Sequence, residues 1–267
     1  DIIDSSASKC IDIQANDVIL DCQGHTIDGT DRAESYGIYV YRGSPTTTNI
    51  TIKNCVLIDW FYGIYFVYSN SNTLTNIIAS SNYNGIYLSF SNSNTLTNTI
   101  ANSNSYGIIL YYSSSNTLTN ITANSNSYGI TLYYSNSNTL TNITANSNSY
   151  GLYLIWSNSN TIKDSKFQNN TNYGIHLYSP SGNLIYNNLF NNTNNFYFAG
   201  TIYTNYWNTT KQPGTNIWNE SLGFIGGNLW TNPSGTGYSD TCKDTDYDGF
   251  CDDPYNLTTN NLDYLPI

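Results

Sequence analysis

The sequence contains no methionine, and only two of its 267 residues are histidine. Charged side chains make up 10% of the chain, against roughly 25% in an ordinary globular domain. The stretch from Trp60 to Ile162 contains no Asp, Glu, Lys, Arg or His. Acid–base and metal chemistry need such groups, so we expect neither in this central segment. The missing Met also predicts a mature chain whose targeting peptide has been removed.

Positive charge is scarce. Eight Lys and Arg stand against 18 Asp and Glu, which gives a net charge of −10 and a pI near 4.2. Nucleic-acid binding needs clustered cations that neutralise phosphates, so this class of partner is excluded. Long apolar runs are also missing, because no segment approaches the roughly 18 consecutive apolar residues of a membrane span.

Export is indicated by five cysteines without zinc-type spacing and by eight Asn-x-Ser/Thr glycosylation acceptors. The acceptors are Asn49, Asn120, Asn142, Asn169, Asn191, Asn208, Asn219 and Asn256. We therefore expect an extracellular or cell-surface protein. Cys242 and Cys251 are close enough in the sequence to form a disulfide. Cys10 with Cys22 would staple the first coil, and Cys22 with Cys55 is the competing pair.

The chain is rich in a repeat of about 22 residues. The segment Thr-Leu-Thr-Asn begins at Thr73, Thr95, Thr117 and Thr139. A glycine followed by an alternating apolar strand keeps the same spacing at Gly63, Gly85, Gly107, Gly129 and Gly151. This period, with short strands and Asn/Ser/Gly turns, predicts an all-β, right-handed parallel β-helix. We expect it over residues 1–205, with a first coil and insertion in 1–48 and regular coils in 49–205.

Equivalent positions of successive coils predict inward columns of like residues. The columns are Ile64, Ile86, Ile108, Ile130, Leu152; Phe66, Leu88, Leu110, Leu132, Leu154; Leu74, Leu96, Leu118, Leu140, Ile162; and Ala79, Ala101, Ala123, Ala145, Phe167. At one bend, stacked amides are expected to hydrogen-bond along Asn54, Asn76, Asn98, Asn120 and Asn142. An uncharged outer face is expected from Tyr65, Tyr87, Tyr111, Tyr133 and Tyr153.

Residues 206–267 lose the repeat and are predicted to form an irregular extension with one sharp motif. Asp244 to Asp252 reads D-x-D-x-D-G-x-x-D and resembles the first nine positions of a calcium loop. The position of the usual bidentate Glu is Tyr255, so Asp253 or Asp263 would complete the shell. The sequence therefore predicts a structural calcium ion. Its ligands are Asp244, Asp246, Asp248, Asp252 and the carbonyl of Phe250.

One titratable cluster precedes the regular coils. It comprises His25, Asp21, Asp28, Asp31, Arg32 and Glu34. A His after Gln-Gly at a coil corner is typical of a turn residue, so we interpret the cluster as structural.

Several segments together resemble archaeal surface proteins with NosD-like, pectin-lyase-type β-helix repeats. They are 20–27 (LDCQGHTI), 52–55 (IKNC), 181–188 (SGNLIYNN), 206–210 (YWNTT), 226–230 (GGNLW), 244–252 and 262–266 (LDYLP). The resemblance covers nearly the whole chain and implies the β-helix fold, export, and a surface or carbohydrate-related role. The NosD name also implies copper-centre assembly, which a chain without Met and with only His25 and His176 does not support.

Two functions are compatible with these features. The charge-free repeat favours a non-enzymatic structural or adhesive protein that assembles with copies of itself into a filament or surface layer. The outward tyrosines favour the alternative, an extracellular carbohydrate-binding protein or a pectin-lyase-like polysaccharide-degrading enzyme. Because pectin-lyase-type enzymes cluster Asp with Arg or Lys on one face, the charge-free coils predict no enzyme activity.

Overall fold

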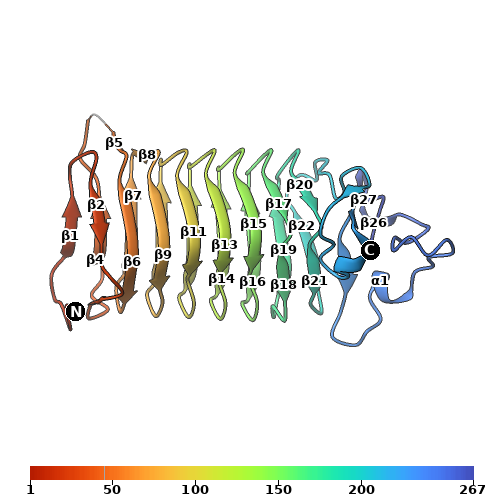
Figure 1. The fold of residues 1–267 in the computed structure, drawn as a ribbon, viewed down its shortest axis with the longest axis horizontal. Coiled ribbons are helices and arrows are strands. Elements are labelled where there is room, and N and C mark those ends of the chain that lie inside the picture. Colours follow the sequence, from red (N-terminus) through yellow and green to blue (C-terminus); the bar gives the residue numbers. More distant parts are fainter. Residues whose placement is uncertain (45) are drawn as a thin grey trace.

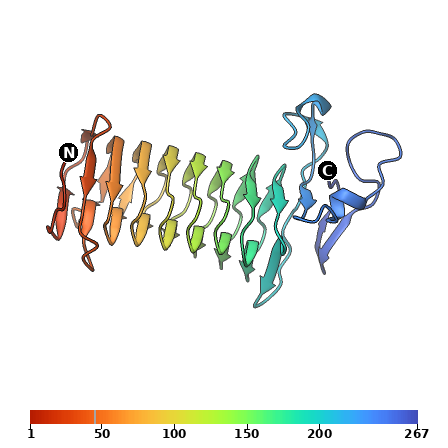
Figure 2. The same cartoon turned by 90° about the horizontal axis from the view of Figure 1, so that it is seen from below.

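The computed structural model describes residues 1–44 and 46–267 and is a rod of stacked coils (Figure 1). Pro45, in the predicted insertion region 1–48, lies outside the described residues. Figure 2 shows two rows of strands running along the rod. All strand pairs within the two large sheets are parallel, and equivalent residues of neighbouring coils lie side by side. The predicted all-β parallel β-helix is confirmed.

One wall of the helix is a nine-stranded sheet, with one strand from each successive coil. Its strands are β1 (Lys9–Ile13), β4 (Tyr36–Val40), β7 (Tyr62–Val67), β10 (Asn84–Ser89), β12 (Tyr106–Tyr111), β14 (Tyr128–Tyr133), β16 (Tyr150–Ile155), β19 (Tyr173–Tyr178) and β22 (Phe196–Ala199). We call this wall the tyrosine sheet, because most of its strands begin with Tyr.

The opposite wall is a twelve-stranded sheet. Its strands are β2 (Ile19–Asp21), β3 (Thr26–Asp28), β6 (Thr51–Ile58), β9 (Thr73–Ala79), β11 (Thr95–Ile100), β13 (Thr117–Thr122), β15 (Thr139–Thr144), β17 (Thr161–Lys163), β18 (Lys166–Gln168), β20 (Leu184–Tyr186), β21 (Leu189–Asn191) and β25 (Leu229–Thr231). Three short pairs lie outside these walls: β5 (Thr47–Thr48) with β8 (Ser69–Asn70), β23 (Gln212–Pro213) with β24 (Phe224–Ile225), and β26 (Tyr255–Thr258) with β27 (Asn261–Asp263).

Helix is almost absent from the described residues. A 3-10 turn η1 (Glu220–Leu222) and one short helix α1 (Tyr238–Thr241) both lie in the C-terminal extension. Neither has the length or the apolar surface to cross a membrane.

The core lies between the two walls and consists of the four predicted columns, all of whose members are fully buried. The repeated glycine follows from the close approach of the coils. A Cβ on Gly85 or Gly107 would lie 2.5 Å from the carbonyl oxygen of the equivalent glycine in the next coil. Any larger residue would push neighbouring coils apart, so the repeat needs glycine at this position.

Asparagine ladders hold the corners between the walls. The predicted ladder from Asn54 to Asn142 is confirmed, with Nδ2–Oδ1 distances of 2.8–3.3 Å, and it is exposed to solvent. Sequence reasoning missed two further ladders that are buried. One begins Asn82, Asn104, Asn126, Asn148, and the other begins Asn72, Asn94, Asn116, Asn138. In both, an Oδ1 accepts from the backbone N–H of the preceding asparagine, which satisfies amides that the corner would otherwise leave unpaired.

The C-terminal extension closes the end of the rod. Asn261 Oδ1 accepts from the backbone N–H of Asn205, so Asn261 is the last member of one buried ladder. Asp263 ends a separate, shorter series, in which the backbone N–H of Asn188 donates to Asn228 Oδ1 and the backbone N–H of Asn228 donates to Asp263 Oδ2. Strand β25 adds to the twelve-stranded sheet beside β21, and Trp230 stacks on Phe190 with ring centroids 4.5 Å apart. Residues 206–267 therefore extend the sheet by one strand and cover the core beyond it.

The predicted disulfide between Cys10 and Cys22 is wrong. Cys22 pairs with Cys55, at a Cα–Cα distance of 4.8 Å, and Cys10 is a free thiol. The reason is the strand register, because Asp21 of β2 lies beside Lys53 of β6 and brings the two cysteines together on one wall. Cys10 belongs to β1 in the other wall.

Candidate functional site

A shallow groove of about 1010 Å³ runs along one corner of the rod, where the twelve-stranded sheet turns into the tyrosine sheet. Successive coils line it with small polar residues, among them Ser81, Ser103, Ser125 and Ser147. These serines adopt a left-handed backbone conformation, with φ between 57° and 59°. The short side chains at this corner, repeated in each coil, leave a continuous trough parallel to the helix axis.

The buried ladder beneath the groove fixes its shape. Asn104 Nδ2 donates to the carbonyl oxygen of Ala79, 3.0 Å away, while Asn104 Oδ1 accepts from the backbone N–H of Asn82 in the preceding coil. The amides are therefore committed to the backbone. In contrast, the hydroxyls of Ser103 and Ser125 make no hydrogen bond within the described part of the chain and remain available to a ligand.

Carboxylates stand at the N-terminal end of this groove. Asp31 and Asp59 both line it, and the backbone N–H of Asp31 donates to the carbonyl oxygen of Asp59, 2.7 Å away. Partial burial raises the pKa of the Asp59 carboxyl, and the negative charges of Asp31, Asp28 and Asp4 raise it further. A carboxyl whose pKa is raised by neighbouring carboxyl groups has the property that a proton donor to a leaving group needs.

The structure divides the predicted N-terminal cluster. Exposed His25 contacts Asp1 at 3.2 Å, and Asp21 pairs with Lys53 at 3.2 Å, so neither reaches the groove. Arg32 donates to the carbonyl oxygen of Ser6, and Glu34 is exposed. Asp28 and Asp31 instead join two residues that sequence reasoning missed.

The missed residues are Asp4 and Asp59. The pairing of Asp28 with Ile58, one residue before Asp59, gives the signal that would have found the second of them. Asp4 reaches the cluster from the N-terminal segment, where its backbone N–H donates to the Asp28 carboxylate at 3.4 Å.

The outer face of the tyrosine sheet is aromatic, as predicted, but its rings fall in separate columns. One column contains Tyr65 and Tyr87 and, further along the sheet, Tyr153. Tyr111 and Tyr133 belong to the neighbouring column.

His176 follows Tyr153 in the first column, with ring centroids 4.4 Å apart. Both of its ring nitrogens are buried without a partner among the described residues, and burial lowers its pKa. It lies five strands from β7, roughly 24 Å along the sheet, so it does not act with Asp59.

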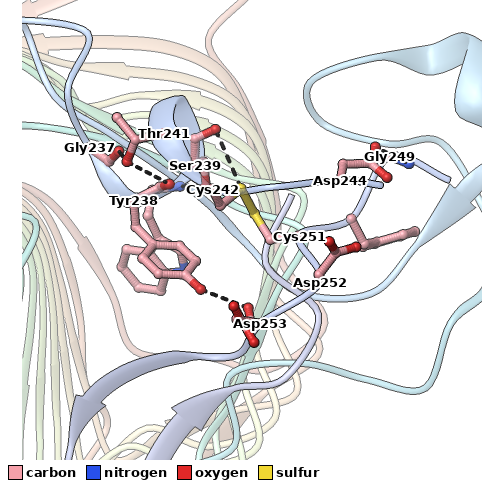
Figure 3. Close-up of a disulfide and its surroundings, with 12 residues drawn as sticks. Gly237, Tyr238, Ser239, Thr241, Cys242, Asp244, Gly249, Cys251, Asp252 and Asp253 are labelled. Carbon is pink, nitrogen blue, oxygen red and sulfur yellow. Dashed lines mark hydrogen bonds between the residues drawn. A yellow bond between two sulfur atoms is a disulfide. The ribbon is translucent and has the colours of Figure 1, made fainter. Parts of the chain in front are cut away.

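The Asp-rich loop is built differently from the predicted calcium shell. Carboxylate oxygens of Asp244, Asp246 and Asp252 lie within 4.8 Å of one another. Asp248 points elsewhere and pairs with Lys211 at 2.6 Å. The Cys242–Cys251 disulfide, with a Cα–Cα distance of 5.7 Å, links the segment after α1 to the far end of the loop (Figure 3). The carboxylate of Asp244 accepts from the backbone N–H of Gly249 at 3.0 Å.

Most of the predicted glycosylation acceptors are solvent-exposed. The exposed ones are Asn49, Asn120, Asn142, Asn169, Asn219 and Asn256, whereas Asn191 and Asn208 are half-buried. Asn120 and Asn142 also belong to the outer ladder.

A family model described as periplasmic copper-binding protein (NosD) matches residues 15–235. No curated protein sequence matches the chain. Among solved structures, the Azotobacter vinelandii mannuronan C-5 epimerase AlgE4 A-module aligns with a TM-score of 0.54 and 15% identity, over 69% of this chain and 58% of that one. The enzymatically active domain of bacteriophage CBA120 tailspike protein 2 aligns with a TM-score of 0.60 and 16% identity, over 89% and 43%. The periplasmic alginate epimerase AlgG aligns with a TM-score of 0.52 and 16% identity, over 67% and 49%.

At these identities the likenesses show the fold, and the chain spans about half the length of the structures it matches. These three structures are nevertheless enzymes by name. The prediction of a non-enzymatic structural or adhesive protein is therefore wrong, and the prediction of no enzyme activity falls with it. It failed because it weighed only the charge-free central coils, whereas the carboxylates stand at the end of the groove that these coils form. Self-association of the chain stays a prediction.

Proposed function

The chain belongs to the NosD family of parallel β-helix repeat proteins, and from this premise we propose that it is an exported enzyme that cleaves a neutral polysaccharide. The observation that carries the proposal is the groove that ends at Asp59, whose pKa is raised. Export is consistent with the two disulfides and with the periplasmic description of the family.

The polysaccharide would lie along the groove, where the serine hydroxyls offer hydrogen bonds to sugar hydroxyls coil after coil. A neutral substrate is favoured because the groove carries no cation, and the only charges among its lining residues are the carboxylates of Asp31 and Asp59. Together with a net charge of −10, these would repel a polyuronate.

Cleavage would proceed by hydrolysis. Protonated Asp59 gives its proton to the glycosidic oxygen as the bond from that oxygen to the anomeric carbon breaks. Water forms the new bond to the anomeric carbon and passes a proton to the Asp31 carboxylate. Asp59 and Asp31 then exchange the proton with solvent, which restores the starting state. The two epimerases that share the fold act, by their names, on mannuronan and on alginate, and this supports a polysaccharide as the substrate class.

The experiment is a reducing-end assay on neutral glucans and mannans with the full chain. Asp59→Asn should lower kcat by about 100-fold or more, because the proton donor is removed. Glu220→Gln is the matched control, since it removes one negative charge from the exposed turn η1 and should leave kcat unchanged. Equal rates for the wild type and Asp59→Asn would contradict the assignment.

Copper binding, which the family description names, does not fit this chain. Copper sites draw on imidazole, thiolate or thioether ligands. The chain has no Met, its two histidines lie apart beside Asp1 and Tyr153, and four of its five cysteines are in disulfides.

The C-terminal loop provides oxygen ligands, and we propose that Asp244, Asp246 and Asp252 bind Ca²⁺ there as a structural ion.

A further inference from the structure

The outer face of the tyrosine sheet contains a slot of about 350 Å³ that the proposed cleavage site does not use. Its floor is formed by Ile109 and Thr131, which pair with one another in neighbouring strands. In the same column Tyr87 precedes them and Tyr153 follows. Because two smaller side chains interrupt a column of tyrosines, the surface is hollowed over two coils.

Stacked aromatic pairs wall the slot on both sides. Tyr106 and Tyr128, at the starts of their strands, stack with ring centroids 4.8 Å apart and planes 5° apart. Tyr111 and Tyr133, at the strand ends, stack at 5.1 Å and 12°. Each ring is held by its partner, so the walls are preorganised for a flat ligand.

The floor of the slot contains one polar atom without a hydrogen-bond partner, the hydroxyl oxygen of Thr131. Thr131 is 6% exposed, and its Oγ1 is buried without a hydrogen-bond partner among the described residues. Native proteins rarely leave a buried hydroxyl unpaired, because its lost hydration is not replaced. A ligand hydroxyl that enters the slot would supply the missing partner. A purely apolar occupant would not.

The absence of charge among the residues that line the slot restricts the class of ligand further. All residues that line the slot lie within the segment from Trp60 to Ile162, which contains no charged side chain. Burial raises the pKa of Tyr62 to about 12 and raises that of Tyr87, so these phenols stay neutral at physiological pH. An anionic or cationic ligand would find no opposite charge here. The occupant that fits is flat, uncharged and rich in hydroxyl groups.

We propose that this slot binds one ring of an uncharged saccharide, whose apolar face packs on the tyrosine walls and whose hydroxyl pairs with Thr131. The proposal rests on the proposed polysaccharide function for its ligand class but requires no cleavage. Phe61 and Tyr83 line both the slot and the groove, so the two surfaces adjoin. The slot is thus a second binding site for the same chain of sugars, beside the one at which Asp59 acts.

The test is isothermal titration with cellohexaose, laminarihexaose, maltohexaose and mannohexaose, and with hexagalacturonate as the acidic comparator. Thr131→Tyr fills the slot with the residue that the column carries at 87 and 153, and it should weaken binding at least 10-fold. Thr131→Val keeps the shape but removes the hydroxyl and should weaken binding about threefold or more. Thr119→Val, on the outer face of the twelve-stranded sheet, is the control and should bind like the wild type.

The proposal is overturned if no neutral hexasaccharide binds, if hexagalacturonate binds best, or if Thr131→Tyr binds like the wild type while its thermal unfolding is unchanged. It is also overturned if sedimentation shows a dimer that Thr131→Tyr dissociates, since a second copy would then occupy the slot. Release of reducing ends without slot-dependent binding would refute the slot alone. Slot-dependent binding without such release would refute the cleavage alone.

Discussion

Asp263 Oδ2 accepts a hydrogen bond from the backbone N–H of Asn228 at 2.8 Å and another from its Nδ2 at 3.2 Å. In the two buried ladders, the side chain that accepts from the backbone N–H of an asparagine is itself an asparagine, as when Asn104 Oδ1 accepts from the backbone N–H and from Nδ2 of Asn82. At the end of the rod the chain places a carboxylate there instead, which is fully buried and also accepts from the Trp230 indole at 2.9 Å. The last member of the series Asn188, Asn228 and Asp263 is therefore titratable.

This carboxylate should make stability depend on pH. Burial raises the pKa of Asp263 to about 7 from 3.8, despite the hydrogen bonds that it accepts. A raised pKa means that the folded chain holds the proton more tightly than the unfolded chain. Stability from this group is complete below about pH 4 and is lost as the pH rises through about 7, by on the order of 4 kcal/mol.

We therefore expect Asp263→Asn to unfold at a higher urea concentration than the wild type at pH 8.5, and this difference to shrink at pH 5. Urea titrations at the two pH values measure it. A difference that is independent of pH would mean that Asp263 is ionised throughout.

The buried ladder should contribute far more to stability than the exposed one. Asn104→Ala leaves the buried N–H of Asn82 without its acceptor and the carbonyl of Ala79 without its donor, so a loss of about 3 kcal/mol is expected. Asn98→Gly is the matched control, because it removes an exposed ladder member while glycine keeps the left-handed backbone at φ 51°. Its loss should stay near 1 kcal/mol. Equal losses in urea unfolding would argue against the distinction.

The rate of hydrolysis should fall at alkaline pH, because Asp59 then loses the proton that it donates. Since Asp28 contributes to the raised pKa of Asp59, Asp28→Asn should lower that pKa and move the alkaline limb of kcat/KM to lower pH. The pH profile of reducing-end release measures the shift. An unmoved or alkaline-shifted limb would show that a group other than Asp59 donates the proton.

The free protein should gain stability from Thr131→Val. The substitution removes an unpaired buried hydroxyl and keeps the β-branched shape, so an increase of about 1 kcal/mol in the free energy of unfolding is expected. Thr119→Val, whose side chain is half-exposed, should change it by less than about 0.5 kcal/mol. A stabilised protein that binds saccharide more weakly would mark Thr131 as a residue kept for binding.

Calcium should raise the melting temperature if the loop binds it. A ligand at 100 times its Kd that binds only the folded state adds about 2.7 kcal/mol. Asp246→Asn should abolish the increase, whereas Asp248→Asn should retain it, because Asp248 pairs with Lys211 and lies outside the group of three carboxylates. Scanning calorimetry with calcium and with chelator distinguishes these outcomes. A response lost equally in both variants would restore Asp248 as a ligand.

The sequence by itself determined the repeating part of this protein. In a parallel β-helix each residue lies beside its equivalent one coil away, so a period of 22 residues is also a map of contacts. The core columns, the glycine column and the outer asparagine ladder follow directly from it. The buried ladders carry the same period, but Asn is equally common in turns, and nothing in the sequence marks which amides point inward.

Only the tertiary structure decided what the period does not govern. Asp31 and Asp59 are separated by an insertion, and Asp4 reaches them from the N-terminal segment, so a raised pKa at Asp59 depends on how these pieces fold together. The partner of Cys22 was set by strand register, and the termination of the ladders at Asn261 and Asp263 by the path of the C-terminal hairpin. The slot could not be predicted from the repeat either, because Ile109 and Thr131 are ordinary strand residues. The slot exists because the same outward column carries tyrosine in the strands on either side of them. Residues that contact one another within the repeat are a fixed number of positions apart in the sequence, so they can be predicted. Contacts between irregular segments depend on how these segments pack, and no sequence spacing predicts them.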